Sequence, residues 1–190
     1  MFLVTELVTL LATNLILTQA LGTSTLFIAA GSKKNLLWTA VTITVFTSVG
    51  SGTAYFVNAL LPDRFADLTL LFYTLIIGAV YVIFLTALYF AGSDSFVTTR
   101  KYVHVSAFNC AVMGTLFTIT DRADAYPSLN TFVNFVLSGA EAGTGFILAA
   151  FILTAAYRKL NSAKVPASFR GFPAMLVYLG LISMAVYALR

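Results

Sequence analysis

Long apolar stretches, separated by short polar ones, run through the whole chain. A helix needs about 20 apolar residues to cross a bilayer, and six stretches approach or exceed that length. They cover residues 2–30, 36–61, 68–91, 102–120, 130–157 and 171–189. The pattern predicts six transmembrane helices joined by polar loops, among them loops at 94–101 and 121–129.

The amino-acid composition, together with this pattern, indicates the fold class. Hydrophobic residues make up 59% of the 190 residues and charged residues 9%, whereas a soluble domain carries roughly a quarter charged residues. One core of this size cannot hide so much apolar surface. We therefore expect an all-α integral membrane protein, with residues 1–190 as a single transmembrane domain in the lipid bilayer. The net charge of +4 is small and gives no indication of nucleic acid binding.

Two of the six segments are interrupted by polar and glycine residues. The first contains Asn14 and the polar run at 22–25, and the fourth contains Asn109, Cys110 and Gly114. Non-helical backbone at membrane depth is tolerated only where it is buried in protein or lines a cavity. We therefore expect helices one and four to be interrupted near the middle of the membrane.

The two interruptions fall at matching places in the two halves of the chain. With three segments in residues 1–91 and three in residues 100–190, the second half must enter the membrane from the opposite face. This predicts two inverted three-helix repeats in which helices one and four correspond. Paired broken helices in inverted halves indicate a functional site near the bilayer midplane.

Lysine and arginine are divided unevenly between the two sides of this topology. One side has eight and the other has three. The eight are Lys33, Lys34, Arg100, Lys101, Arg158, Lys159, Lys164 and Arg170, and the three are Arg64, Arg122 and Arg190. The positive-inside rule places the eight in the cytoplasm and both termini outside.

Cys110 is the only cysteine of the chain. A single cysteine excludes an internal disulfide and any metal cluster held only by thiolates of this chain. Because free cysteine packs like a small hydrophobe, an inert structural thiol is one interpretation. We expect Asn109 and Asn14 to bond backbone groups freed at the two breaks, rather than an ion. His104 is expected to be a satisfied interfacial residue.

Glu141 is an acid in the middle of the fifth segment, between Gly139 and Gly143. Acids within membrane segments are candidates for function, here for an ion or proton path. Small residues four positions apart also suit close helix contact. The alternative is therefore a protonated or hydrogen-bonded glutamate at such a contact.

Four stretches, in order along the chain, resemble one family. NLILTQALG at 14–22 is similar to its first helix, SKK at 32–34 to its first cytoplasmic turn, and NCAVMG at 109–114 to its cysteine-bearing motif on helix four. KVPASFRG at 164–171, followed by GLISMA at 180–185, is similar to its last loop and helix. By these motifs the chain resembles the RnfA and NqrE membrane subunits of Rnf complexes and sodium-pumping NADH:quinone oxidoreductases. The VPASFRG loop places it nearer RnfA.

The resemblance implies six helices in two inverted halves and a sister subunit of opposite orientation, RnfE-like or NqrD-like. In the family each sister supplies one cysteine from helix one and one from helix four, and these thiolates hold a [2Fe–2S] cluster within the membrane. Electrons cross the bilayer through that cluster, to or from flavins of neighbouring subunits. The resemblance also implies partner subunits that bind ferredoxin and NAD, in a bacterial or archaeal cytoplasmic membrane.

The chain departs from this pattern at the first-helix cysteine. The ligand position aligns with Ser24, so Cys110 is the one thiolate that the chain offers. Asn109, next to it, is a further candidate contact to the cluster. Three interpretations stay open: the sister supplies three ligands, a non-thiolate ligand such as Ser24 completes the set, or the centre is absent or altered.

The leading hypothesis is an integral subunit of an Rnf-type complex that relays electrons across the membrane through the shared iron–sulfur centre. This relay would be coupled to Na⁺ or H⁺ translocation, and the chain would have no complete active site of its own. Its sequence contains no phosphate-binding glycine loop, nucleophile constellation or zinc motif. One alternative is a small inverted-repeat ion transporter or channel subunit, in which Glu141 and the two breaks bind an ion and Cys110 is inert. The other is a non-redox scaffold that holds the sister in place.

Overall fold

The computed structural model describes residues 14–30, 33–61, 63–91 and 93–188, and the regular secondary structure in these ranges is entirely helical. The helices are α2 (Leu15–Gln19), α3 (Thr23–Ala30), α4 (Lys33–Leu60), α5 (Thr69–Ala91), α6 (Ser93–Ala107), α7 (Cys110–Ala125), α8 (Phe132–Leu160) and α9 (Phe172–Tyr187), with 3-10 turns η1 (Asp63–Leu68) and η2 (Pro127–Leu129). The all-α expectation is confirmed. Residues 2–13 of the first predicted segment lie outside the described residues.

Several of these helices are long and apolar enough to cross a membrane. Three meet that condition alone: Asn35–Leu60, Thr69–Phe90 and Phe132–Tyr157. A fourth span is formed if the bent pair α6 and α7 counts as one. Helix α9 is apolar but has 16 residues, which is shorter than a full span. The described residues therefore contain three or four candidate spans.

Two of the predicted loops are wrong. Helix α6 begins at Ser93, so the polar run at 94–101 is helical, and α7 continues to Ala125 through most of the loop expected at 121–129. Loss of apolar character marks where a helix leaves the lipid, not where its backbone hydrogen bonds end. Since those bonds lie within the segment, a helix can continue through polar residues into water.

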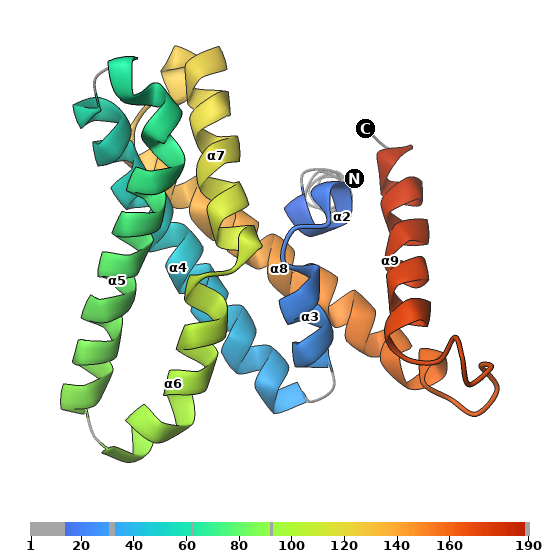
Figure 1. The fold of residues 1–190 in the computed structure, drawn as a ribbon. Helices are drawn as coiled ribbons and strands as arrows, with labels where there is room; N and C mark the ends of the chain where they lie inside the picture. The colour runs from blue at the N-terminus through green and yellow to red at the C-terminus, as the bar shows by residue number, and fades with distance from the viewer. Residues whose placement is uncertain (1–13, 31–32, 62, 92, 189–190) are drawn as a thin grey trace, which may run out of the picture.

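Helices α4 and α8 form the most extensive helix–helix contact among the described residues, and Figure 1 shows them side by side through the middle of the molecule. Glycines of α8 permit the close approach. A Cβ atom at Gly139 would lie 2.4 Å from the carbonyl oxygen of Thr47, and one at Gly143 would lie 2.6 Å from the Cα of Thr44. The close helix contact expected from this spacing of small residues is therefore confirmed.

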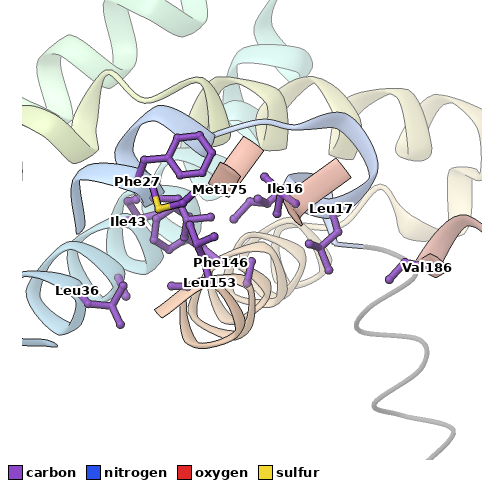
Figure 2. Close-up of a cluster of buried hydrophobic side chains, with 14 residues drawn as sticks. Ile16, Leu17, Phe27, Leu36, Ile43, Phe146, Leu153, Met175 and Val186 are labelled. Atoms are coloured by element: carbon purple, nitrogen blue, oxygen red, sulfur yellow. The ribbon is translucent and has the colours of Figure 1, made fainter. Parts of the chain in front are cut away.

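One hydrophobic cluster joins the broken first segment to α4, α8 and α9. Figure 2 shows its labelled side chains converging between these helices. They are Ile16 and Leu17 of α2, Phe27 of α3, Leu36 and Ile43 of α4, Phe146 and Leu153 of α8, and Met175 and Val186 of α9. The short helices α2 and α3 are thus held in place by packing.

A second hydrophobic cluster joins α6 and α7 to α4 and α5. Its buried members include Phe46 of α4, Tyr73 and Ile77 of α5, Val103 of α6 and Leu116 of α7. Much of α5 faces away from the protein, because few of its residues besides Tyr73 and Ile77 are buried. An apolar helix with so little protein cover indicates contact with lipid or with another membrane protein.

Candidate functional site

The first helix break lies between α2 and α3. Helix α2 ends at Ala20, whose φ of 57° is left-handed, and Gly22 follows with a φ of 79°. Glycine adopts this conformation without the steric cost that a side chain adds. A Cβ at Gly22 would also lie 2.9 Å from the Cβ of Ala111 on α7. Gly22 therefore allows both the turn and the close approach of α7.

The second break separates α6 from α7, which are bent by 44° relative to each other. Asn109 lies at the break in an extended conformation, and its Oδ1 accepts a hydrogen bond of 2.9 Å from the backbone N–H of Ala111. Asn14 caps α2 in the same way through the N–H groups of Ile16 and Leu17. Both asparagines have the structural role expected of them.

The two breaks meet at Cys110. The backbone N–H of Gly22 donates a hydrogen bond to Cys110 Sγ at 3.0 Å, across 88 positions of sequence. One turn later, a Cβ at Gly114 would lie 2.2 Å from Leu21 Cδ1, so this glycine admits the Leu21 side chain. Cys110 itself is exposed at the start of α7. Its sulfur is therefore positioned by one helix break and remains open to a second protein.

Two buried polar atoms close to Cys110 in the sequence lack a hydrogen-bond partner among the described residues. They are Nδ2 of Asn109, which is next to Cys110 in the chain, and Oγ of Ser106, one turn earlier on α6. Both side chains are nearly inaccessible, at 4% and 0% exposure. Because a buried polar group without a partner is costly, these two atoms mark the second break as a place of functional interest.

Ser24, the other sequence-predicted ligand, is exposed on the first turn of α3, two residues after Gly22. The side chains of the described residues contain no group of three or more histidine, cysteine, aspartate or glutamate residues placed to hold a metal. One exposed thiol and one exposed hydroxyl do not make a complete metal centre within the described part of this chain, so a centre here would need ligands from elsewhere.

Glu141 lies away from the α4–α8 contact. It lines a pocket of about 30 Å³ where α2, α7 and α8 meet. The other lining residues are Asn14, Leu15, Thr115, Thr118, Ile119, Arg122, Ser138, Ala142 and Gly145. The sequence analysis did not identify Thr115, Thr118 and Arg122 of α7 as residues of this pocket. Their spacing at 115, 118 and 122, which places them on one helical face, is the signal that would have found them.

His104 is satisfied, as expected. Its Nδ1 shares a hydrogen bond with the hydroxyl of Tyr81 on α5, and the Tyr81 ring also contacts Phe108. The pair lies on the outer side of α5 and α6. It links the end of α6 to α5 just before the second break.

Comparison with known proteins gives the chain its family. The family described as "Rnf-Nqr subunit, membrane protein" matches residues 3–190. The chain belongs to the Rnf-Nqr family. The resemblance drawn from the four sequence stretches is therefore confirmed, and the membrane character of the chain with it.

Curated relatives of this Rnf-Nqr chain are named as RnfA-type subunits of an ion-translocating oxidoreductase complex. The protein from Aeromonas hydrophila is 24% identical over 180 residues, which cover 93% of this chain and 90% of the relative. Those from Pseudoalteromonas atlantica and Rhodobacter capsulatus are 25% and 27% identical over 186 residues, covering 97% of this chain and 93% of each relative. The placement nearer RnfA agrees with these names.

Proposed function

We propose that this Rnf-Nqr chain relays electrons across a membrane as one half of a two-subunit redox module. In this proposal Cys110 is a ligand of a [2Fe–2S] centre shared with a sister subunit, and electron flow is coupled to translocation of Na⁺ or H⁺. The observation that carries the proposal is the Gly22 N–H···Sγ hydrogen bond at an exposed thiol. It supports a sulfur that is held for a ligand, not packed as an inert side chain.

The residues around Cys110 suit a thiolate ligand. When bound, an iron–sulfur centre supplies a one-electron carrier whose potential depends on hydrogen bonds to its sulfurs. The Gly22 N–H stabilises negative charge on Sγ, and Cys110 also stands at the N-terminal end of α7, where the helix dipole is positive. Asn109 and Ser106, whose Nδ2 and Oγ have no partner among the described residues, precede Cys110 by one and four positions.

The remaining ligands come, in our proposal, from an RnfE-like or NqrD-like sister of opposite orientation. Ser24 takes the place of the family's first-helix cysteine without acting as a ligand, because serine is a poor substitute for a thiolate. Relatives named as subunits of an ion-translocating oxidoreductase complex support assembly with other subunits. The flavin-bearing and the ferredoxin-binding and NAD-binding partners belong to the same proposal.

We also propose six spans in two inverted halves, in a bacterial or archaeal cytoplasmic membrane with both termini outside. The halves would be α2/α3, α4 and α5 in the first, and α6/α7, α8 and α9 in the second. Each broken helix packs mainly against unbroken helices of the opposite half: α2 and α3 join a cluster with α8 and α9, and α6 and α7 join one with α4 and α5. The packing of each broken helix against the opposite half supports a two-fold relation between the halves.

Iron and acid-labile sulfide analysis of the purified complex tests the redox proposal. We expect Cys110→Ala and Cys110→Ser to lose the centre and electron transfer while the complex still assembles. The serine variant is the matched control, since its hydroxyl can still accept the Gly22 hydrogen bond while providing a poor ligand. Ser24→Ala should keep iron and sulfide at the unmodified level. Full activity and iron content in both Cys110 variants would refute the proposal and favour a transporter or scaffold role.

A further inference from the structure

We infer that the pocket between α2, α7 and α8 binds one sodium ion, with Glu141 as its charged ligand. These three helices can be followed in Figure 1. The inference rests on the ion translocation of the proposed function and gives it a carboxylate site in this chain that does not include Cys110. It would give this chain its own part in ion movement.

The pocket has the size and position for such a site. Its volume of about 30 Å³ is enough for one water molecule or a small desolvated cation, since a cavity needs roughly 10–15 Å³ to hold a water. Glu141 lies within the candidate span Phe132–Tyr157. An acid at membrane depth is costly unless it has a partner or a function.

Glu141 is on the opposite side of α8 from the residues that pack against α4. Gly139 and Gly143 make that close contact, so the acid is not required for it. The Glu141 side chain is exposed, and its carboxylate makes no hydrogen bond to any other described residue. The group is therefore free to exchange a bound cation.

Helix α7, which faces Glu141 across the pocket, supplies further oxygen atoms that could coordinate a cation. The hydroxyls of Thr115 and Thr118 donate their hydrogens to the carbonyls of Ala111 and Gly114, at 2.7 and 2.8 Å. A hydroxyl that donates to the backbone keeps lone pairs on its oxygen. These hydroxyl oxygens and the Glu141 carboxylate are hard ligands, which can coordinate a small cation.

Asn14 fixes the wall of the pocket and is not itself a ligand. Its Oδ1 caps α2, and its Nδ2 donates to the carbonyl of Gly145 at 2.7 Å, one turn after Glu141 on α8. The bonds attach α2 to α8 beside the acid. The helix break of the first segment thus determines the shape of the site.

Arg122 is the one other charged side chain that lines the pocket among the described residues. Asp121 and Asp124 lie beside it on the exposed end of α7, and the described parts of α2 and α4 bring no charged side chain to this face. A cation bound at the Glu141 carboxylate would lie in the same pocket as the Arg122 guanidinium. Repulsion between these like charges weakens its binding and makes the site exchangeable.

Labelling of the intact complex with a hydrophobic carbodiimide tests the inference, because this reagent modifies protonated carboxyls. We expect modification of Glu141, detected by mass spectrometry of its peptide and absent in Glu141→Gln. Na⁺ should suppress this labelling, while K⁺ at equal ionic strength should not. Glu141 that is unlabelled, or labelled to the same extent in Na⁺ and in K⁺, overturns the inference.

Matched variants separate the site from general effects on the protein. If Na⁺ protects, Thr118→Val should raise the Na⁺ concentration for half-protection about tenfold, as expected for loss of one oxygen ligand. Thr86→Val on α5, whose hydroxyl donates to the backbone in the same way, should have no effect. Asp124→Asn should leave Glu141 labelling unchanged. Cys110→Ala should also leave it unchanged, so failure of the redox proposal and failure of this inference give different results.

Discussion

Among single residues, Gly22 and Cys110 make the contact on which the redox proposal depends. The sequence indicated Cys110 by its polar neighbours and by the family motif, but it held no sign of the residue that would contact the sulfur. Gly22 is 88 positions away, and no local pattern encodes a tertiary contact of that kind. The positive φ of Gly22 and the missing side chain together explain why glycine occupies this position.

Gly22→Ala should disturb the centre without removing its ligand. A left-handed conformation costs an alanine roughly 1–2 kcal/mol, and the added Cβ would lie 2.9 Å from that of Ala111. Relief of this strain moves the N–H away from Cys110, so the reduced, more negative centre is less stabilised. We expect a lower reduction potential in redox titrations of the complex. Gly180→Ala on α9, with nothing within 4 Å of its added Cβ, is the control.

At the scale of elements, the sequence predicted the helical segments and their two interruptions. Apolar length identified α4, α5 and α8, and the asparagines and glycines indicated the breaks before α7 and between α2 and α3. It placed the start of α6 too late and the end of α7 too early, because polar residues continue a helix beyond its apolar part. It also predicted the close helix contact at Gly139 and Gly143, but not that α4 would be the partner.

Gly139→Ala should weaken the packing of α8 on α4. The new Cβ would lie 2.4 Å from the backbone carbonyl oxygen of Thr47, which cannot rotate away as a side chain can. Overpacking of this kind costs typically 1–3 kcal/mol, so we expect a lower melting temperature of the purified complex. Gly78→Ala on α5 has open space around the added methyl group and should be neutral or slightly stabilising. Equal melting temperatures for the two variants would contradict the packing described for α4 and α8.

At the scale of the whole molecule, the two hydrophobic clusters relate the halves of the chain. Each cluster combines one broken helix with unbroken helices from the other half, and α4 and α8 join the two clusters. The sequence could suggest an inverted repeat only from the three segments in each half and from the matched positions of the breaks. Similarity between the halves is weak because the same packing can be made by many apolar side chains.

Cysteine labelling with a membrane-impermeant maleimide tests the proposed topology. We expect Asp67→Cys and Asp124→Cys to react in intact cells, and Lys101→Cys and Lys164→Cys to react only in inside-out vesicles. These sites follow from the division of lysine and arginine between the two sides. The unmodified protein, with Cys110 alone, measures the background. Reaction of residues 124 and 164 from the same side would contradict a membrane-spanning α8.

The redox proposal requires that Cys110 bind a metal centre shared with a second membrane protein of the complex, at the point where the two helix breaks meet. A high-resolution cryo-electron microscopy map of the intact complex would show whether it does. We expect metal density bonded to Cys110 Sγ, with the remaining ligands from a neighbouring chain and the Gly22 N–H still directed at the sulfur. A map in which Cys110 faces lipid, with no metal and no second protein beside it, would refute the proposal.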